Sequence, residues 1–183
     1  MTTAAPPPRE VLPWNRFGEA SRELAQLVSG GGWMPDLVIA VARGGLIPAG
    51  AIAYALGVKA MGAMNVEFYT GVDQTLPEPL LLPPLLDTSV LAGAKVLVVD
   101  DVADSGRTLE MVMRLLRTGS APATDQHVRA PSEHLPAEAR SAVLYTKPRS
   151  VIEPDYTWRR TDRWIAFPWS TLPPVTAAAT TEA

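Results

Sequence analysis

Hydrophobic positions along the chain alternate between two patterns. Short, uninterrupted runs of mostly β-branched residues, such as 96–99, are typical of parallel strands that are covered on both faces of a sheet. Between these runs, apolar residues recur at helical spacing. The patterns predict strands over 37–41, 58–66, 96–99 and 141–147, and helices over 14–28, over 47–56 and from Leu109 onward, with glycines 30–32 ending the first helix. We therefore expect an α/β protein with a central, mostly parallel sheet flanked by helices.

The remaining segments lack a clean period. Residues 1–13 and 171–183 are rich in Pro, or in Pro, Thr and Ala, and we expect them to be mobile tails around one domain over 14–170. Residues 69–89 hold four prolines and several leucines, which predicts a long irregular loop. Residues 118–138 are polar and read as an inserted surface excursion.

Two adjacent carboxylates, Asp100 and Asp101, follow the 96–99 run. Ligands of open α/β sheets bind outside the carboxyl ends of the strands, so these acids are placed for a metal or for ribose hydroxyls. A compact turn comes next, composed of Ala103, Asp104, Ser105, Gly106, Arg107 and Thr108. Its backbone N–H groups can surround a phosphate at the start of the following helix. The alternative is a plain strand-to-helix connection with Asp104 or Ser105 as N-cap. That alternative explains the cap but not the two acids, which repel each other when they are buried without compensation.

Three other short segments carry candidate chemistry. Arg43 and Gly44 begin a tight turn after the 37–41 strand, Lys147 ends the 141–147 strand, and Trp164-Ile165 lies in an aromatic segment. Each has a simpler interpretation: a solvated arginine at a helix entry, a solvated strand-end lysine, and an aromatic core edge. Neither GxGxxG nor GxxxxGK[ST] occurs, so the dinucleotide and P-loop interpretations lack their glycines.

The segment over 95–116, with its apolar strand, two acids and compact turn, resembles the motif with which type I phosphoribosyltransferases bind phosphoribosyl pyrophosphate (PRPP), and the three other segments occur in the order typical of that family. Within that family the order of the segments over 36–169 is most similar to the bacterial xanthine-guanine (6-oxopurine) enzymes. The resemblance implies the type I fold with a flexible hood at 69–89 and a cis bond between Ala42 and Arg43. It also implies PRPP and a purine base as substrates and a homo-oligomer, dimer or tetramer.

The resemblance also implies a role for each candidate residue. Arg43 and Gly44 would bind pyrophosphate, and Asp100 and Asp101 would hold the ribose hydroxyls and the cofactor Mg²⁺, directly or through water. The loop of Ala103, Asp104, Ser105, Gly106, Arg107 and Thr108 would bind the 5′-phosphate. Asp104 would exchange the proton at N7, Lys147 would donate to O6, and Trp164 and Ile165 would hold the base. Two positions depart from the family pattern: Phe68-Tyr69 stands where Ser-Tyr is common, and Arg107 replaces a small residue.

Composition narrows the class of protein. With 183 residues, 47% hydrophobic and 19% charged, the chain can form one domain core. The net charge of −3 disfavours general nucleic-acid binding, and zero cysteines agree with a cytoplasmic location. No apolar run is long enough to span a bilayer, and no signal sequence opens the chain.

Other function classes remain to be weighed. A PRPP-sensing regulator that has lost turnover would keep the same binding residues, although the presence of Asp104, Lys147 and Trp164 favours an enzyme. A signalling receiver domain would carry its paired acids near the start of the chain. A hydrolase using Asp125, His127 and Ser132 is disfavoured because the sequence has no nucleophile elbow. The sequence leaves the choice between guanine, xanthine and hypoxanthine open.

Overall fold

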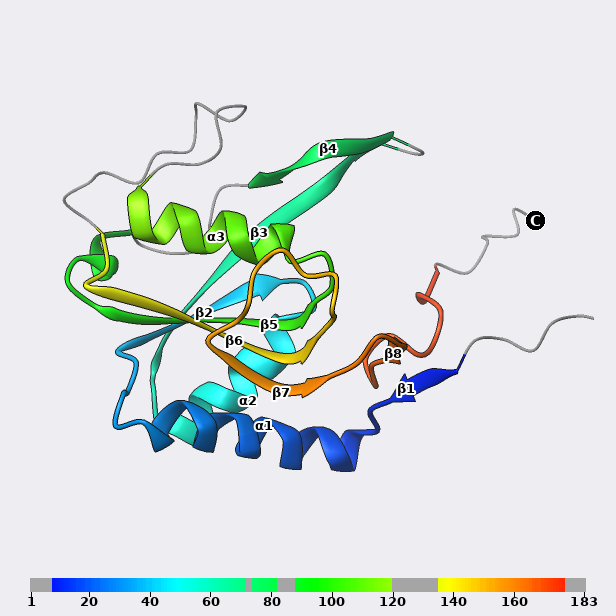
Figure 1. The fold of residues 1–183 in the computed structure, drawn as a ribbon, viewed down its shortest axis with the longest axis horizontal. Coiled ribbons are helices and arrows are strands. Elements are labelled where there is room, and N and C mark those ends of the chain that lie inside the picture. Colours follow the sequence, from blue (N-terminus) through cyan, green and yellow to red (C-terminus); the bar gives the residue numbers. More distant parts are fainter. Residues whose placement is uncertain (1–7, 72–73, 82–87, 120–134, 177–183) are drawn as a thin grey trace, which may run out of the picture.

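The computed structural model describes residues 8–71, 74–81, 88–119 and 135–176. Its main sheet has six strands in the order β4-β3-β2-β5-β6-β7, and all neighbours are parallel except β3 and β4 (Figure 1). The strands are β2 (Leu37–Ala42), β3 (Ala60–Gly71), β4 (Gln74–Leu81), β5 (Lys95–Ala103), β6 (Glu138–Thr146) and β7 (Tyr156–Arg160). The predicted α/β architecture with a mostly parallel sheet is confirmed.

Helices cover both faces of this sheet, as the apolar runs predicted. Helices α1 (Trp14–Gly30) and α2 (Leu46–Leu56) lie on one face and α3 (Arg107–Thr118) lies on the other (Figure 1). Successive strand side chains point to opposite faces. Val38 and Ala40 accordingly pack in the core with α1 and α2, whereas Ile39 and Val41 pack in the core with α3. Two separate hydrophobic cores thus cover the two faces of the sheet.

The parallel order brings three candidate segments to one edge. Because β2, β5 and β6 are neighbours and run in the same direction, their carboxyl ends meet there. The turn that starts at Arg43, the acids of β5 and Lys147 all follow or occupy these ends. The fold therefore brings together three candidate segments that lie far apart in the sequence.

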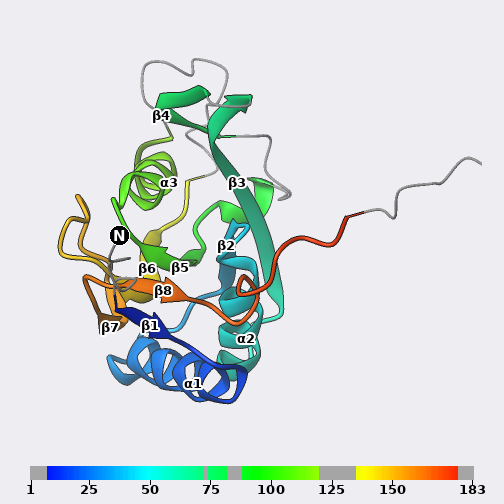
Figure 2. The same ribbon diagram turned by 90° about the vertical axis from the view of Figure 1, so that its right-hand side faces the viewer.

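A small second sheet corrects the predicted N-terminal tail. Strand β1 (Arg9–Val11) pairs in parallel with β8 (Trp164–Ala166), and Figures 1 and 2 both show the two strands side by side near the start of α1. Leu12 follows β1 and is only 1% exposed. The expectation of a tail over 1–13 is thus wrong for residues 9–12, because burial of Leu12 and pairing with β8 fix them. Residues 1–7 and 177–183 of the two expected tails lie outside the described residues.

The segment expected to be an irregular loop at 69–89 is largely a β-hairpin. Strand β3 continues to Gly71 and pairs antiparallel with β4, and a short 3₁₀ helix, η1 (Thr88–Leu91), follows. The backbone pairing, with register shifts, replaces the expected structureless loop; residues 72–73 and 82–87 lie outside the description. Most of the expected 118–138 excursion, 120–134, lies outside it as well.

A smaller difference concerns the start of α3. Helix α3 begins at Arg107, before the predicted Leu109, and its N-cap position is Gly106 without a side-chain hydrogen bond. The alternative in which Asp104 or Ser105 caps the helix is therefore wrong. Within the described segments, no helix is long and apolar enough to cross a membrane.

Candidate active site

The turn after β2 touches the acids at the end of β5. The Ala42–Arg43 peptide bond is cis, as the family resemblance implied. A Cβ on Gly44 would overlap the carboxylate of Asp101, and one on Gly45 would overlap two backbone carbonyl oxygens. Only glycine permits this close approach. Arg43, Gly44 and Asp101 together line a cavity of about 660 Å³ that is open to solvent.

Asp100 and Asp101 lie in the last part of β5 and differ in access. Asp100 is 9% exposed, and its carboxylate accepts a hydrogen bond from the backbone N–H of Asp101 at 2.8 Å. Burial raises the pKa of Asp100 well above its ordinary value, and the neighbouring charge of Asp101 raises it further. Burial also raises the pKa of Asp101, to about 6. The ionised form of both carboxylates is thus less stable than that of an ordinary aspartate. A bound cation would stabilise the ionised form and lower both pKa values.

The donor set fits Mg²⁺. This ion is usually held by one or two carboxylates together with substrate phosphates, and rarely by a cage made of protein ligands alone. Asp101 faces the larger cavity, and Asp100 lies directly beside it in the chain. Within the described residues, no group of three or more His, Cys, Asp or Glu side chains gathers as a metal site, so the protein would supply only this pair of acids. Asp100 and Asp101 are the residues that would hold the ion together with substrate phosphates.

The loop between β5 and α3 has the shape of an anion site. Gly106 has a φ of 77°, which L-residues with side chains rarely adopt, and a Cβ there would overlap the hydroxyl of Ser150. The first turn of the 12-residue helix α3 leaves backbone N–H groups without intrahelical acceptors at its positive end. Ser105 and Arg107 are exposed, Thr108 is half-buried and Ala103 is buried. Arg107 lines neither of the two cavities described here.

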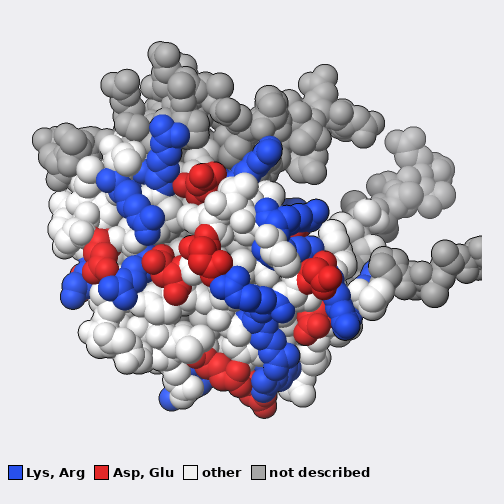
Figure 3. Space-filling model, in the orientation of Figure 1, with Lys and Arg blue, Asp and Glu red and all other residues white. Residues whose placement is uncertain are grey.

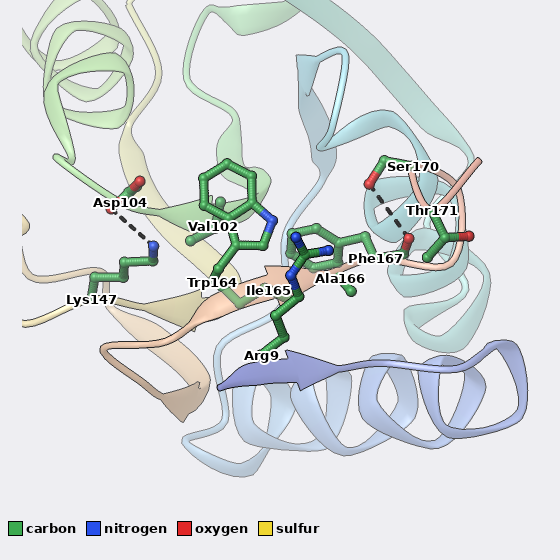
Figure 4. Close-up of a pocket in the computed structure, with 10 residues that line it drawn as sticks. All are labelled: Arg9, Val102, Asp104, Lys147, Trp164, Ile165, Ala166, Phe167, Ser170 and Thr171. Atoms are coloured by element: carbon green, nitrogen blue, oxygen red, sulfur yellow. Dashed lines mark hydrogen bonds and ion pairs between the residues drawn. The ribbon is translucent and has the colours of Figure 1, made fainter. Parts of the chain in front are cut away.

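A second cavity, of about 380 Å³, collects the residues expected to bind a base. Asp104, Lys147, Trp164 and Ile165 all line it, and Figure 4 shows the first three around one space. The Lys147 Nζ lies 3.5 Å from Asp104 Oδ1 and 5.6 Å from the centre of the Trp164 ring. These distances correspond to an ion pair and a cation–π contact. One donor, one acceptor and one aromatic face therefore share a cavity.

Burial decides between the interpretations of Lys147 and Trp164. The Lys147 side chain is 8% exposed, which is unusual for lysine and excludes the solvated strand-end charge. Trp164 is 63% exposed, so it is not an edge of the core and its ring is accessible to a ligand. Ile165 is buried in the core, whereas Trp158 and Trp169 pack against it from the outside. Trp164 thus lines the cavity as an exposed side chain, whereas Ile165 and Phe167 line it from the core.

Two basic residues of the site were missed in the sequence. Arg149 contacts both oxygens of Asp104, with Nε 2.7 Å from Oδ1 and Nη2 2.6 Å from Oδ2. Its position in the same loop as Lys147 could have indicated it. Arg9 lines the smaller cavity from β1, where the sequence predicted only a tail. Phe167 and Thr171 also line this cavity, so the expected C-terminal tail begins inside the site.

Charge at the surface agrees with a small, local anion site. On the face in Figure 3, acidic side chains border the basic ones. The expectation that local groups, chiefly Arg43 and the first turn of α3, bind an anionic ligand stays a prediction.

Comparison with known proteins identifies the family. A family model of the phosphoribosyl transferase domain matches residues 9–173. The xanthine-guanine phosphoribosyltransferase of Cereibacter sphaeroides is 30% identical over 85% of this chain and 83% of its own, and that of a Ruegeria strain is 31% identical over 86% and 83%. The crystal structure of a purine phosphoribosyltransferase from Pyrococcus horikoshii matches with a TM-score of 0.69 at 32% identity, covering 93% of this chain and 99% of that one. The chain therefore belongs to the phosphoribosyltransferase family and has its type I fold.

Proposed function

We propose that the protein transfers the 5-phosphoribosyl group of PRPP to a 6-oxopurine base and releases pyrophosphate. The observation that carries the proposal is the pairing of Lys147 with Asp104 beside Trp164 in one cavity. A 6-oxopurine presents the O6 acceptor and N7 side by side on one edge. A buried ammonium next to a carboxylate complements that edge.

The cavity favours a 6-oxo base over a 6-amino base. The Lys147 ammonium has only donors, so it matches O6 but opposes the amino group of adenine. The Trp164 ring offers an exposed face for stacking, an interaction worth roughly 1–3 kcal/mol per base in nucleic-acid complexes. The cavity volume of about 380 Å³ agrees with a small flat ligand.

PRPP would lie along the edge of the sheet between the two cavities, which share Ser170. The first turn of α3 would take the 5′-phosphate, and Arg43 with the backbone at Gly44 would take pyrophosphate. Asp100 and Asp101 would hold the ribose hydroxyls and Mg²⁺. The ion, when bound, would neutralise the charge that develops on pyrophosphate.

In the reaction, the bond between C1 of the ribose and the pyrophosphate oxygen breaks, and a bond between C1 and a nitrogen of the five-membered purine ring forms. The electron pair of the broken bond leaves with pyrophosphate. The proton on N7 passes to the Asp104 carboxylate, which lies at the cavity wall beside Lys147. This assigns general acid/base catalysis to Asp104.

The proposal includes three wider points. The reaction would serve purine salvage in the cytoplasm, in agreement with the absence of cysteine from the sequence. It would require Mg²⁺. The active form would be a homo-oligomer, a dimer or tetramer.

The test is an assay of the purified chain with PRPP and Mg²⁺. Guanine, xanthine, hypoxanthine, adenine, uracil and orotate are offered separately, and nucleotide and pyrophosphate are both measured. Reactions without PRPP, and reactions with EDTA, serve as controls. We expect that only the 6-oxopurines are converted, and that one pyrophosphate is released for each nucleotide formed.

Two results would contradict the proposal. Transfer to adenine or to a pyrimidine would remove the assigned role of Lys147. PRPP binding in calorimetry without transfer to any base would instead support a PRPP-sensing regulator.

A further inference from the structure

Arg9 lies beside the proposed base site because of the register of the small sheet. It pairs with Trp164 in the parallel β1–β8 ladder, and aligned residues of adjacent strands point to the same face. Figure 4 shows the Arg9 side chain reaching from β1 toward the Trp164 ring, with Lys147 and Asp104 on the other side of that ring. The next residue, Glu10, pairs instead with Arg159 at 3.9 Å. The strand thus directs Arg9 alone to the cavity.

Arg9 differs from the other basic groups at this site in its partners. Lys147 and Arg149 both pair with Asp104. Among the side chains that the structure describes (residues 8–66, 89–119 and 135–176), no carboxylate lies within 4.0 Å of the Arg9 side chain. A guanidinium carries five N–H donors and no acceptor. Its donors are therefore available to a ligand in the cavity.

We propose that Arg9 reads the substituent at C2 of the base and selects an oxygen there, so that the preferred substrate is xanthine. This inference rests on the proposed function. With O6 at Lys147 and N7 at Asp104, the C2 edge of the purine points away from both residues. Arg9 occupies that side of Trp164 (Figure 4).

The three 6-oxopurines carry different groups at C2, and a hydrogen-bond donor such as Arg9 can distinguish them. Xanthine has a carbonyl oxygen at C2, which accepts from the guanidinium. Guanine has an amino group, so two donors would face each other, and hypoxanthine has only hydrogen. Polar mismatches of this kind discriminate more strongly than a missing methylene does. Arg9 is exposed, so water can solvate it when the ligand does not, and the discrimination is smaller than in a closed site.

The experiment measures kcat/KM for xanthine, hypoxanthine and guanine with the wild type, Arg9→Met, Arg9→Lys and the control Arg163→Met. Arg163 is an exposed arginine next to Trp164 that lines neither cavity. We expect the wild type to prefer xanthine over guanine. Arg9→Met should lower kcat/KM for xanthine by about tenfold through KM, as expected for one lost charged hydrogen bond. The PRPP KM and the hypoxanthine constants should stay within about threefold, and Arg9→Lys should recover part of the xanthine activity. Arg163→Met should behave as wild type.

A second readout separates specificity from folding. Binding of xanthosine and guanosine 5′-monophosphates is measured by calorimetry, and Arg9→Met should weaken the former selectively. Equal losses for all three bases, or an unchanged xanthine-to-guanine ratio, would overturn the inference and leave the proposed function standing. Failure of the wild type to use any 6-oxopurine would overturn both.

Discussion

Arg149 and Asp104 form a two-point ion pair, with Nε and Nη2 of the arginine 2.7 and 2.6 Å from the two carboxylate oxygens. Arg149 therefore engages both oxygens of the carboxylate that we assign to proton transfer. The Arg149 side chain is 67% exposed, however, so solvent screens the attraction. Exposed pairs contribute only about 0–1 kcal/mol. The arginine can be displaced by a ligand at little cost.

Arg149→Met should consequently have a small effect. We expect kcat and the base KM to stay within about fivefold of wild type, which corresponds to about 1 kcal/mol. Steady-state kinetics with the preferred base measure both constants. A loss of a hundredfold or more would show that Arg149 takes part in catalysis.

Asp104→Asn should have a much larger effect in the same place. The amide keeps the size of the side chain but cannot accept the N7 proton, so kcat should fall by about 10²-fold or more. PRPP affinity, measured by calorimetry with Mg²⁺, should change little because Asp104 lines the base cavity and not the larger one. Activity close to wild type would remove Asp104 from the mechanism.

Asp101→Asn tests the electrostatics of the paired acids through stability. Burial raises the pKa of Asp101 from 3.8 to about 6. The folded state therefore binds this proton more tightly than the unfolded state, and stability is lost as pH rises from about 4 to about 6. The variant cannot ionise, so it should match wild type near pH 4 and be more stable above pH 6, by at most about 3 kcal/mol.

Urea unfolding at pH 4.5 and pH 7.5, without PRPP or Mg²⁺, measures this difference. The same variant should bind Mg²⁺-PRPP more weakly at pH 7.5, because it lacks the anion. Destabilisation by the same amount at both pH values would mean that the carboxylate is structural and that its burial is compensated.

The sequence predicted the parts of the site that are local. Asp100, Asp101 and Gly106 belong to one strand-loop-helix segment, and the approach of that segment to a phosphate depends on backbone geometry over a few residues. The role of Lys147 was implied only by the family resemblance, and the parallel pairing of β5 with β6 brings it to the same edge of the sheet. The predictions for the 95–116 segment needed no knowledge of distant contacts.

Long-range pairing explains what the sequence could not predict. Strand β1 is three residues long and finds its partner β8 at the other end of the chain, so no local pattern marks Arg9. The prolines at 77 and 79 suggested a loop, yet β4 is an edge strand with β3 as its one neighbour. A proline in an edge strand leaves no central ladder bond unmade. The hairpin therefore tolerates them.

Gly44→Ala tests the contact between the turn after β2 and Asp101. The added Cβ would overlap the Asp101 carboxylate and displace it. Overpacking of this kind typically costs about 1–3 kcal/mol, so the Kd for PRPP with Mg²⁺ should rise about tenfold or more in calorimetry. Gly50→Ala in α2 is the matched control, since apart from its chain neighbours and the backbone of its own helix no atom lies within 4 Å of the added Cβ. The control should bind PRPP normally and be about 0.5–1 kcal/mol more stable. Equal PRPP affinity in both variants would contradict the role of this turn.

Lys147→Met tests the choice of base. Methionine keeps most of the aliphatic stem in its buried position but removes the donor, so the loss should appear in the base KM and not in PRPP binding. Since charged hydrogen bonds contribute about 1.5–3 kcal/mol, kcat/KM for every 6-oxopurine should fall by about 10- to 100-fold. The ratio of kcat/KM for 6-oxopurines to kcat/KM for adenine should fall at the same time, because no buried donor then opposes the 6-amino group. The assay compares guanine, xanthine, hypoxanthine and adenine, and Lys59→Met, an exposed lysine that lines neither cavity, is the control. Unchanged constants for all four bases would mean that Lys147 is buried only to pair with Asp104, and that another group recognises the purine.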